Sequence, residues 1–219
     1  MKKKVLSAAL AAILAVTFMA GCSAGPTTDK VIETANAYGM KKSEDLSSFL
    51  TTKNEGVPSY YASEDSTEVN MLYQTLFMHG ENGSDAVPES IVVCMEVDAQ
   101  NKSDYATASG DGVHTYIYAV SAKDNKSAKS IYDMTADLMK ANGDKEESKG
   151  GYTYILHQSP LPLGATSEDD SAGTGFLGIY VKGKTVIYID FDIGDNDSSK
   201  CAEYFCKELG LVSPLTLKK

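Results

Sequence analysis

Residues 176–193 carry an alternating pattern that fits a β-hairpin. Residues 176–181 and 186–193 are rich in β-branched and aromatic types, and Lys182, Gly183 and Lys184 separate the two runs. Such runs on either side of a short glycine-containing turn are typical of neighbouring antiparallel strands. In the second run one face has four apolar residues, so the other face is wet or lines a cleft. That second face carries Tyr188, Asp190 and Asp192.

The same periodicities predict the remaining elements of an α+β domain. Strands are expected at residues 57–61, 91–98, 113–121 and 151–158. Helical patterns occur at residues 29–38, 67–79, 125–142 and 198–209, and Gly39, Gly143 and Gly210 are suited to end helices. We predict a mainly antiparallel sheet with helices packed on one face. The order of elements after residue 113 is also compatible with a split βαβ, ferredoxin-like arrangement.

The first and last predicted helices share a pattern of residues. Both have apolar residues at matching positions, then a glycine and another apolar residue. This match is compatible with a duplication in which residues 29–219 form a single domain of two similar halves, although such helix ends are common. The matched sets are Val31, Ala35, Tyr38, Gly39 and Met40, and Ala202, Cys206, Leu209, Gly210 and Leu211.

The N-terminal residues form an export signal rather than part of the domain. Three lysines, Lys2 to Lys4, precede an apolar run over residues 5–19. A membrane-spanning helix needs about 20 apolar residues, so this run is too short. A positive start, a short apolar stretch and small residues are typical of a secretory signal peptide.

The end of this signal, Met19-Ala20-Gly21-Cys22, resembles the lipobox of bacterial lipoproteins. The first position of that motif is usually leucine, so Met19 is a departure. The resemblance covers residues 1–22 and implies that residues 1–21 are removed. It also implies that the Cys22 sulfur receives a diacylglyceryl group and that acyl chains such as palmitate hold the protein on the membrane. An ordinary secreted protein cut after Ala20 or Gly21 is the alternative.

These residues predict a cell-membrane location on the extracytoplasmic face. Residues 22–28 would form a short tether, and residues 29–219 resemble uncharacterised lipoproteins of Gram-positive bacteria without matching a named family. Cleavage before Cys22 would leave 198 residues, enough to bury a core without disulfides or metals.

Charge restricts the classes of ligand. All 20 basic residues are lysine, and without Lys2 to Lys4 the chain has 17 lysines against 30 acids, a net charge of −13. This balance opposes binding of nucleic acid or of an anionic membrane surface. The chain also lacks arginine, whose fork-shaped side chain best binds phosphate. We therefore expect no nucleic-acid partner.

One sequence pattern imitates a nucleotide site. Residues 178–185 match the phosphate-binding pattern G-x-x-x-x-G-K-[ST]. That loop requires a following helix, whereas here strand-forming residues follow, so we interpret Gly183-Lys184 as a hairpin turn and expect no nucleotide.

Cysteine and histidine spacing favours no cofactor or metal. Beyond Cys22, the three remaining cysteines are an odd number, and we expect mostly buried free thiols, although a disulfide from Cys94 to Cys201 or to Cys206 is open. The three histidines are 35 and 43 residues apart, unlike the close pairs of zinc sites. Acids at positions 190, 192, 195 and 197 lack the spacing of a calcium-binding EF-hand.

Tyrosines supply the candidate ligand-binding residues. Tyr116 and Tyr118 share a strand face, as do Tyr152 and Tyr154, so a sheet could present a tyrosine stripe for sugar or peptide. Packing beneath helices is the alternative. We expect a non-catalytic module that binds an envelope protein or glycan. The alternative is a cell-envelope hydrolase that pairs Asp190 or Asp192 with another carboxylate such as Glu96.

Overall fold

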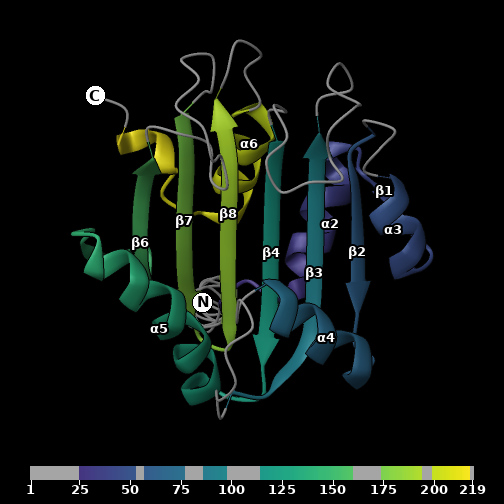
Figure 1. Cartoon of the computed structure of the whole chain (residues 1–219), viewed down its shortest axis with the longest axis horizontal. Helices are drawn as coiled ribbons and strands as arrows, with labels where there is room; N and C mark the ends of the chain where they lie inside the picture. The colour runs from purple at the N-terminus through teal and green to yellow at the C-terminus, as the bar shows by residue number, and fades with distance from the viewer. Residues whose placement is uncertain are drawn as a thin grey trace, which may run out of the picture.

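Eight strands of the computed structural model form one continuous sheet, in the order β1-β2-β3-β4-β8-β7-β6-β5 (Figure 1). The structure describes residues 25–52, 57–76, 86–97, 114–159, 174–193 and 199–217. Neighbouring strands are antiparallel, except that β1 and β2 are parallel. The strands are β1 (Lys41–Lys42), β2 (Ser59–Ser63), β3 (Pro88–Val97), β4 (His114–Ala122), β5 (Glu146–Lys149), β6 (Tyr152–Ser159), β7 (Thr174–Lys182) and β8 (Thr185–Ile193).

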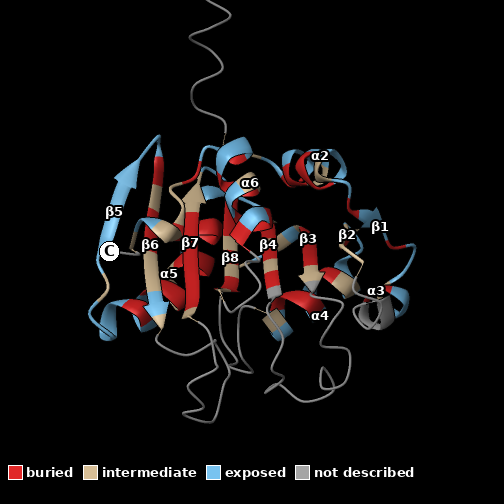
Figure 2. Ribbon diagram, turned by 90° about the horizontal axis from the view of Figure 1, so that it is seen from above, coloured by how far each residue is buried: buried red, intermediate tan, exposed pale blue. Residues whose placement is uncertain are grey.

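Helices lie on both faces of this sheet, which gives three layers (Figure 2). One face packs against α2 (Thr28–Tyr38) and α6 (Ser199–Leu209), and the other against α4 (Ser66–Leu76) and α5 (Asn125–Ala141). The short helix α3 (Leu46–Thr52) contacts β2, and the 3-10 helix η2 (Pro214–Leu217) contacts β6 and β7.

The α+β class and the mainly antiparallel sheet are confirmed, but our expectation of helices on one face is wrong. The central strands are apolar on both sides, so each face needs a cover. On β4, Ile117 faces α6 while Val120 faces α5, and both are fully buried. On β8, Ile187 faces α6 and Val186 faces α5, and both are also fully buried.

The predicted ferredoxin-like arrangement is not confirmed. In a split βαβ unit the two strands joined by the helix are parallel. Here α5 leads from β4 to β5, and these two strands are parallel, but three strands (β8, β7 and β6) lie between them, whereas a split βαβ unit leaves room for one. Strands β6, β7 and β8 instead follow one another as a meander.

The two matching helices, α2 and α6, lie in contact on the same face. Both end at a glycine with a left-handed backbone, Gly39 at φ 96° and Gly210 at φ 69°. The next amide closes the helix in each case: Met40 donates to the Ala35 carbonyl at 3.0 Å and Leu211 to the Cys206 carbonyl at 2.8 Å. The matching residues therefore form the same helix-ending motif.

The part of the chain that the structure describes contains no helix with the length and apolar character needed to span a membrane.

The phosphate-binding pattern at residues 178–185 is a hairpin in the structure. It covers the end of β7, a turn at Gly183-Lys184 and the start of β8. Gly183 has a φ of 60°, which suits glycine in a tight turn. Gly178 is explained by packing, because a Cβ there would collide with the ring and hydroxyl of Tyr180. The Tyr180 hydroxyl is fixed by donating to the Val212 carbonyl at 2.6 Å.

This packing predicts that Gly178→Ala destabilises the protein. Overpacking a filled core costs about 1–3 kcal/mol, and the free energy of unfolding in urea should fall by that amount. The double variant Gly178→Ala/Tyr180→Ala tests the cause, since removing the ring removes the collision. Its loss of stability should be smaller than the sum of the two single losses. Additive losses would show that Tyr180 is not the reason for Gly178.

Candidate functional site

Tyrosines and aspartates gather on the α5-facing side of the two central strands. Alternating side chains of β4 and β8 point to this side: Tyr116 and Tyr118 from β4, and Tyr188, Asp190 and Asp192 from β8. Tyr116 pairs with Asp190 in the register, and Tyr118 pairs with Tyr188. We call these five residues the Tyr–Asp face.

The three rings of the Tyr–Asp face form a continuous row. The centroids of Tyr116 and Tyr118 are 6.0 Å apart with nearly parallel planes, and those of Tyr118 and Tyr188 are 5.6 Å apart. All three side chains are partly buried and pack against the core beneath α4 and α5. The row therefore offers ring edges and faces together with phenol groups.

The negative charge of Asp190 acts on this row. Burial raises the pKa of Tyr118 well above its ordinary value, and the charge of Asp190 raises it further. The pKa of Tyr188 is raised by the same two causes in the same order. Both phenols therefore stay protonated at neutral pH and can donate hydrogen bonds as well as accept them. Asp190 is half-buried beside them and only accepts when ionised.

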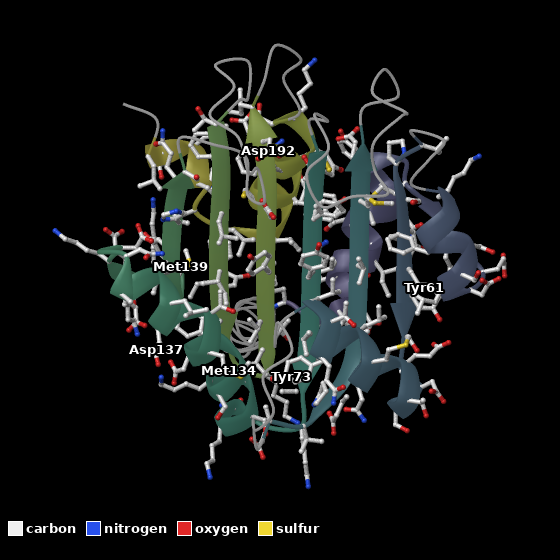
Figure 3. All side chains as sticks on the ribbon, in the orientation of Figure 1. Tyr61, Tyr73, Met134, Asp137, Met139 and Asp192 are labelled. Atoms are coloured by element: carbon white, nitrogen blue, oxygen red, sulfur yellow. The ribbon has the colours of Figure 1, made fainter. Side chains whose placement is uncertain are left out.

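Asp192 lies near the far end of β8, where Figure 3 shows it above the region between α4 and α5. It is only 1% exposed, which is unusual for a carboxylate. Its register partner on β7 is Gly175, which has no side chain. Farther down this face Tyr73 of α4 and Met134 of α5 approach each other, with the Tyr73 hydroxyl 3.8 Å from the Met134 sulfur.

A histidine–aspartate pair lies on the same face, two strands away. His157 on β6 pairs with Leu177 on β7, which in turn pairs with Asp190. The His157 Nδ1 is 2.7 Å from an Asp144 oxygen, and both side chains are mostly buried. Sequence reasoning missed Asp144, because it follows α5 in a connecting segment and nothing in its spacing points to β6.

The structure separates the four tyrosines that we predicted as one stripe. Tyr152 and Tyr154 lie on the opposite, α6-facing side of the sheet and are 5% and 4% exposed. The Tyr152 hydroxyl donates to the Leu209 carbonyl, and the Tyr154 hydroxyl donates to Glu147, both at 2.8 Å. These two residues pack in the core, whereas Tyr188 takes the place beside Tyr116 and Tyr118. In the sequence, the alternation of Tyr188 with Asp190 and Asp192 could have indicated that Tyr188 shares their face.

The predicted pairing of Asp190 or Asp192 with Glu96 is wrong. Glu96 points to the α2-facing side of β3, so the sheet separates it from both aspartates. Both carboxylate oxygens of Glu96 instead accept from the Tyr38 hydroxyl, each at 3.1 Å. A hydrolase built from these three carboxylates is therefore not supported, since paired acids must flank one bond.

The cysteines are not poised as nucleophiles. Cys94, Cys201 and Cys206 are all buried and none is in a disulfide. Burial raises the pKa of Cys94 and of Cys201, and raises that of Cys206 to about 12. The reactive form of a cysteine is the thiolate, so these side chains act as small apolar groups.

Metal-binding groups are not assembled in the described part of the chain, where no three His, Cys, Asp or Glu side chains could hold an ion together. His114 and His157 lie on strands separated by β8 and β7, so their strands are not neighbours. His79, Asp195 and Asp197 lie outside the described residues.

Buried tyrosines predict a loss of stability in alkali. The pKa of Tyr61 is raised to about 12 by burial and by its bond to Glu68, and burial raises that of Tyr152 to about 12. In the unfolded chain both would ionise near pH 10. Their contribution is thus complete below pH 10 and is lost as the pH rises to 12. The free energy of unfolding should fall by about 1.4 kcal/mol per pH unit for each such tyrosine.

Absorbance at 295 nm and urea unfolding between pH 9 and 12 measure this effect. In Tyr152→Phe the free energy of unfolding should fall less steeply with pH, by the contribution of one tyrosine, about 1.4 kcal/mol per pH unit. Reversible ionisation of all 13 tyrosines near pH 10 in the folded protein would contradict the prediction.

Comparison of the chain with protein-family models, with curated proteins and with solved structures returned no match.

Proposed function

We propose that this protein is a membrane-anchored extracytoplasmic lipoprotein whose domain is a non-catalytic binding module. The lipobox-like sequence ending at Cys22 supports the anchor. The observation that carries the binding role is the Tyr–Asp face, where a row of three adjacent tyrosine rings shares one face of the central strands with two carboxylates. Binding faces commonly combine rings with a few polar groups in this way.

The chemistry of this face favours a neutral or positively charged ligand. Its described residues supply tyrosine rings, phenol groups and carboxylates, and the chain has no arginine to bind an anion. Carboxylates and phenols accept hydrogen bonds from the hydroxyls of a sugar or the amines of a peptide. Rings can stack on the apolar side of a sugar or on a cation. An envelope glycan or an amine-bearing peptide satisfies both requirements.

Ligand binding should depend on the rings of Tyr116 and Tyr118. Replacing a central aromatic residue of a binding face commonly costs more than 1 kcal/mol, so Tyr116→Ala/Tyr118→Ala should weaken binding by roughly tenfold or more. Purified cell-wall glycan and a lysine-containing cell-wall peptide serve as probes in calorimetry. A retained helical and strand circular dichroism spectrum shows that the variant is folded.

Tyr60→Phe is the matched control, because Tyr60 is a strand tyrosine on the opposite face whose hydroxyl donates to Asn36 at 2.9 Å. This variant should bind as the wild type does. Wild-type protein that binds neither probe, or equal binding by the double alanine variant, would contradict the proposed role of the face.

The anchor has its own test. Cys22→Ala should abolish incorporation of a clickable palmitate analogue and move the protein from the membrane fraction to the medium, because no acyl chain remains. Cys206→Ala is the control, since this buried thiol should not be acylated. Labelling that persists in Cys22→Ala would overturn the anchor without bearing on the Tyr–Asp face.

A further inference from the structure

Strand β5 forms one edge of the sheet, and all four of its residues are exposed. Figure 2 shows it at the margin of the sheet, beyond β6. The strand at the opposite edge, β1, has only two residues. Of these two edges of the described sheet, β5 therefore offers the longer row of backbone groups to another strand.

The turn after β5 determines which backbone groups point outward. Gly150-Gly151 has φ angles of 64° and 82°, and the two residues that flank it are register partners. Two consecutive positive φ angles are typical of a type I′ hairpin turn, which is closed by a hydrogen-bonded pair. Hydrogen-bonded and non-hydrogen-bonded pairs alternate along an antiparallel ladder. The backbone groups of Lys149 and Glu147 therefore point to β6, whereas those of Ser148 and Glu146 point away from it.

The side chains of β5 alternate between the two sides of the sheet. Glu147 pairs with Tyr154, which faces α6, so Glu147 and Lys149 lie on the α6-facing side. Ser148 and Glu146 lie on the α5-facing side. The Tyr154 hydroxyl donates to Glu147 at 2.8 Å and so holds this carboxylate in place. The edge thus presents an acid and a base on one side, two residues apart.

Charge favours one register for a second copy of β5. In a continuous antiparallel sheet, directly opposite residues share a side. With Ser148 opposite Ser148 of the second copy, each Glu147 lies opposite a Lys149, and the outward backbone groups of the two serines can bond each other. Moving the register by one step places Glu147 opposite Glu147, or Lys149 opposite Lys149. Like charges directly opposite each other are destabilising.

The neighbouring charges are compatible with this register. Glu146 falls opposite a glycine and pairs within its own copy with Lys140 at 2.9 Å. Lys145 falls opposite Gly151, near Lys182 of the second copy, and its exposed side chain can extend into water. Charged side chains usually protect an edge strand from pairing. Here they oppose the two neighbouring registers and favour the one centred on the serine.

We propose that two copies of this protein associate edge to edge through β5, with Ser148 on the two-fold axis. The same patch is then buried on both copies, and the two sheets form one continuous sheet. Four residues give a small interface and the chain is strongly negative, so the dimer is weak and forms at high protein concentration. This inference depends neither on the anchor proposed at Cys22 nor on the Tyr–Asp face.

Paired cysteine variants test the register. All of them carry Cys22→Ala, which leaves only three buried thiols besides the introduced one. Opposite residues of a non-hydrogen-bonded pair have Cα atoms about 4.5 Å apart, within the range of about 4.4–6.8 Å for a disulfide, whereas diagonal neighbours are about 7–8 Å apart. A mixture of Glu147→Cys and Lys149→Cys at millimolar concentration with oxidised glutathione should therefore give roughly tenfold more linked dimer than either variant alone.

The exposed strand at the other edge supplies the matched control. A mixture of Lys41→Cys and Lys42→Cys in the same background should give no more linked dimer than either variant alone. Circular dichroism shows that each variant is folded, and mass spectrometry identifies the chains in each linked band.

Charge variants test the same contact without a covalent link. Glu147→Lys or Lys149→Glu places like charges opposite each other, so each should weaken the dimer by about three- to tenfold in sedimentation equilibrium. Mixing the two variants should restore association, because opposite charges face each other again in the mixed dimer.

Three outcomes would overturn the dimer: no excess of linked product in the Glu147→Cys and Lys149→Cys mixture, a wild type that stays monomeric at millimolar concentration, or a foreign chain in the linked band. Equal linking by Glu147→Cys alone would overturn the register. Failure of the mixed charge variants to associate would overturn the role of the Glu147–Lys149 contact. None of these results bears on the anchor or on the Tyr–Asp face.

Discussion

The central antiparallel pair β4–β8 is the constraint on which the rest of the structure depends. Its two strands are apolar on both sides, with Ile117 and Ile187 facing α6 and Val120 and Val186 facing α5. A sheet of this kind is stable only when both faces are covered, so helices must lie on each side. The β8 residues of the Tyr–Asp face (Tyr188, Asp190 and Asp192) lie where this apolar pattern breaks, in the part of β8 after Ile187. The candidate site therefore lies on the central strands of the sheet and not at its edge.

The two ends of the sheet have different character. The end beside Gly25 has tight connections, with the Gly183-Lys184 turn between β7 and β8 and the Gly150-Gly151 turn between β5 and β6. The other end carries Asp192 and Glu96 on the strands and Lys200 at the start of α6.

Sequence periodicity predicted most of this fold because its elements have clear two-residue or helical patterns. The hairpin of residues 174–193 and the helix ends at Gly39 and Gly210 were predicted closely for that reason. The short elements α3, β1, β5 and η2 were missed, because two to seven residues carry too little pattern. The sequence analysis also failed to predict that helices cover both faces of the sheet. Period-two patterning shows which residues share a face of one strand, but the face shared by two strands depends on register. That is why Tyr152 was grouped with Tyr116, and Glu96 with Asp190, across opposite sides of the sheet.

Strand geometry sets the distance between the β7–β8 turn and the candidate site. Asp192 is seven positions after Thr185, the residue beside the turn, and a strand rises about 3.3 Å per residue. Asp192 is therefore about 23 Å from Thr185 along the strand. Gly25 lies beside the turn, so with the anchor that we propose at Cys22 the turn would be nearer to the membrane than the upper part of the Tyr–Asp face. The anchor that we propose at Cys22 would therefore be compatible with the class of ligand that the tyrosines and aspartates favour on chemical grounds.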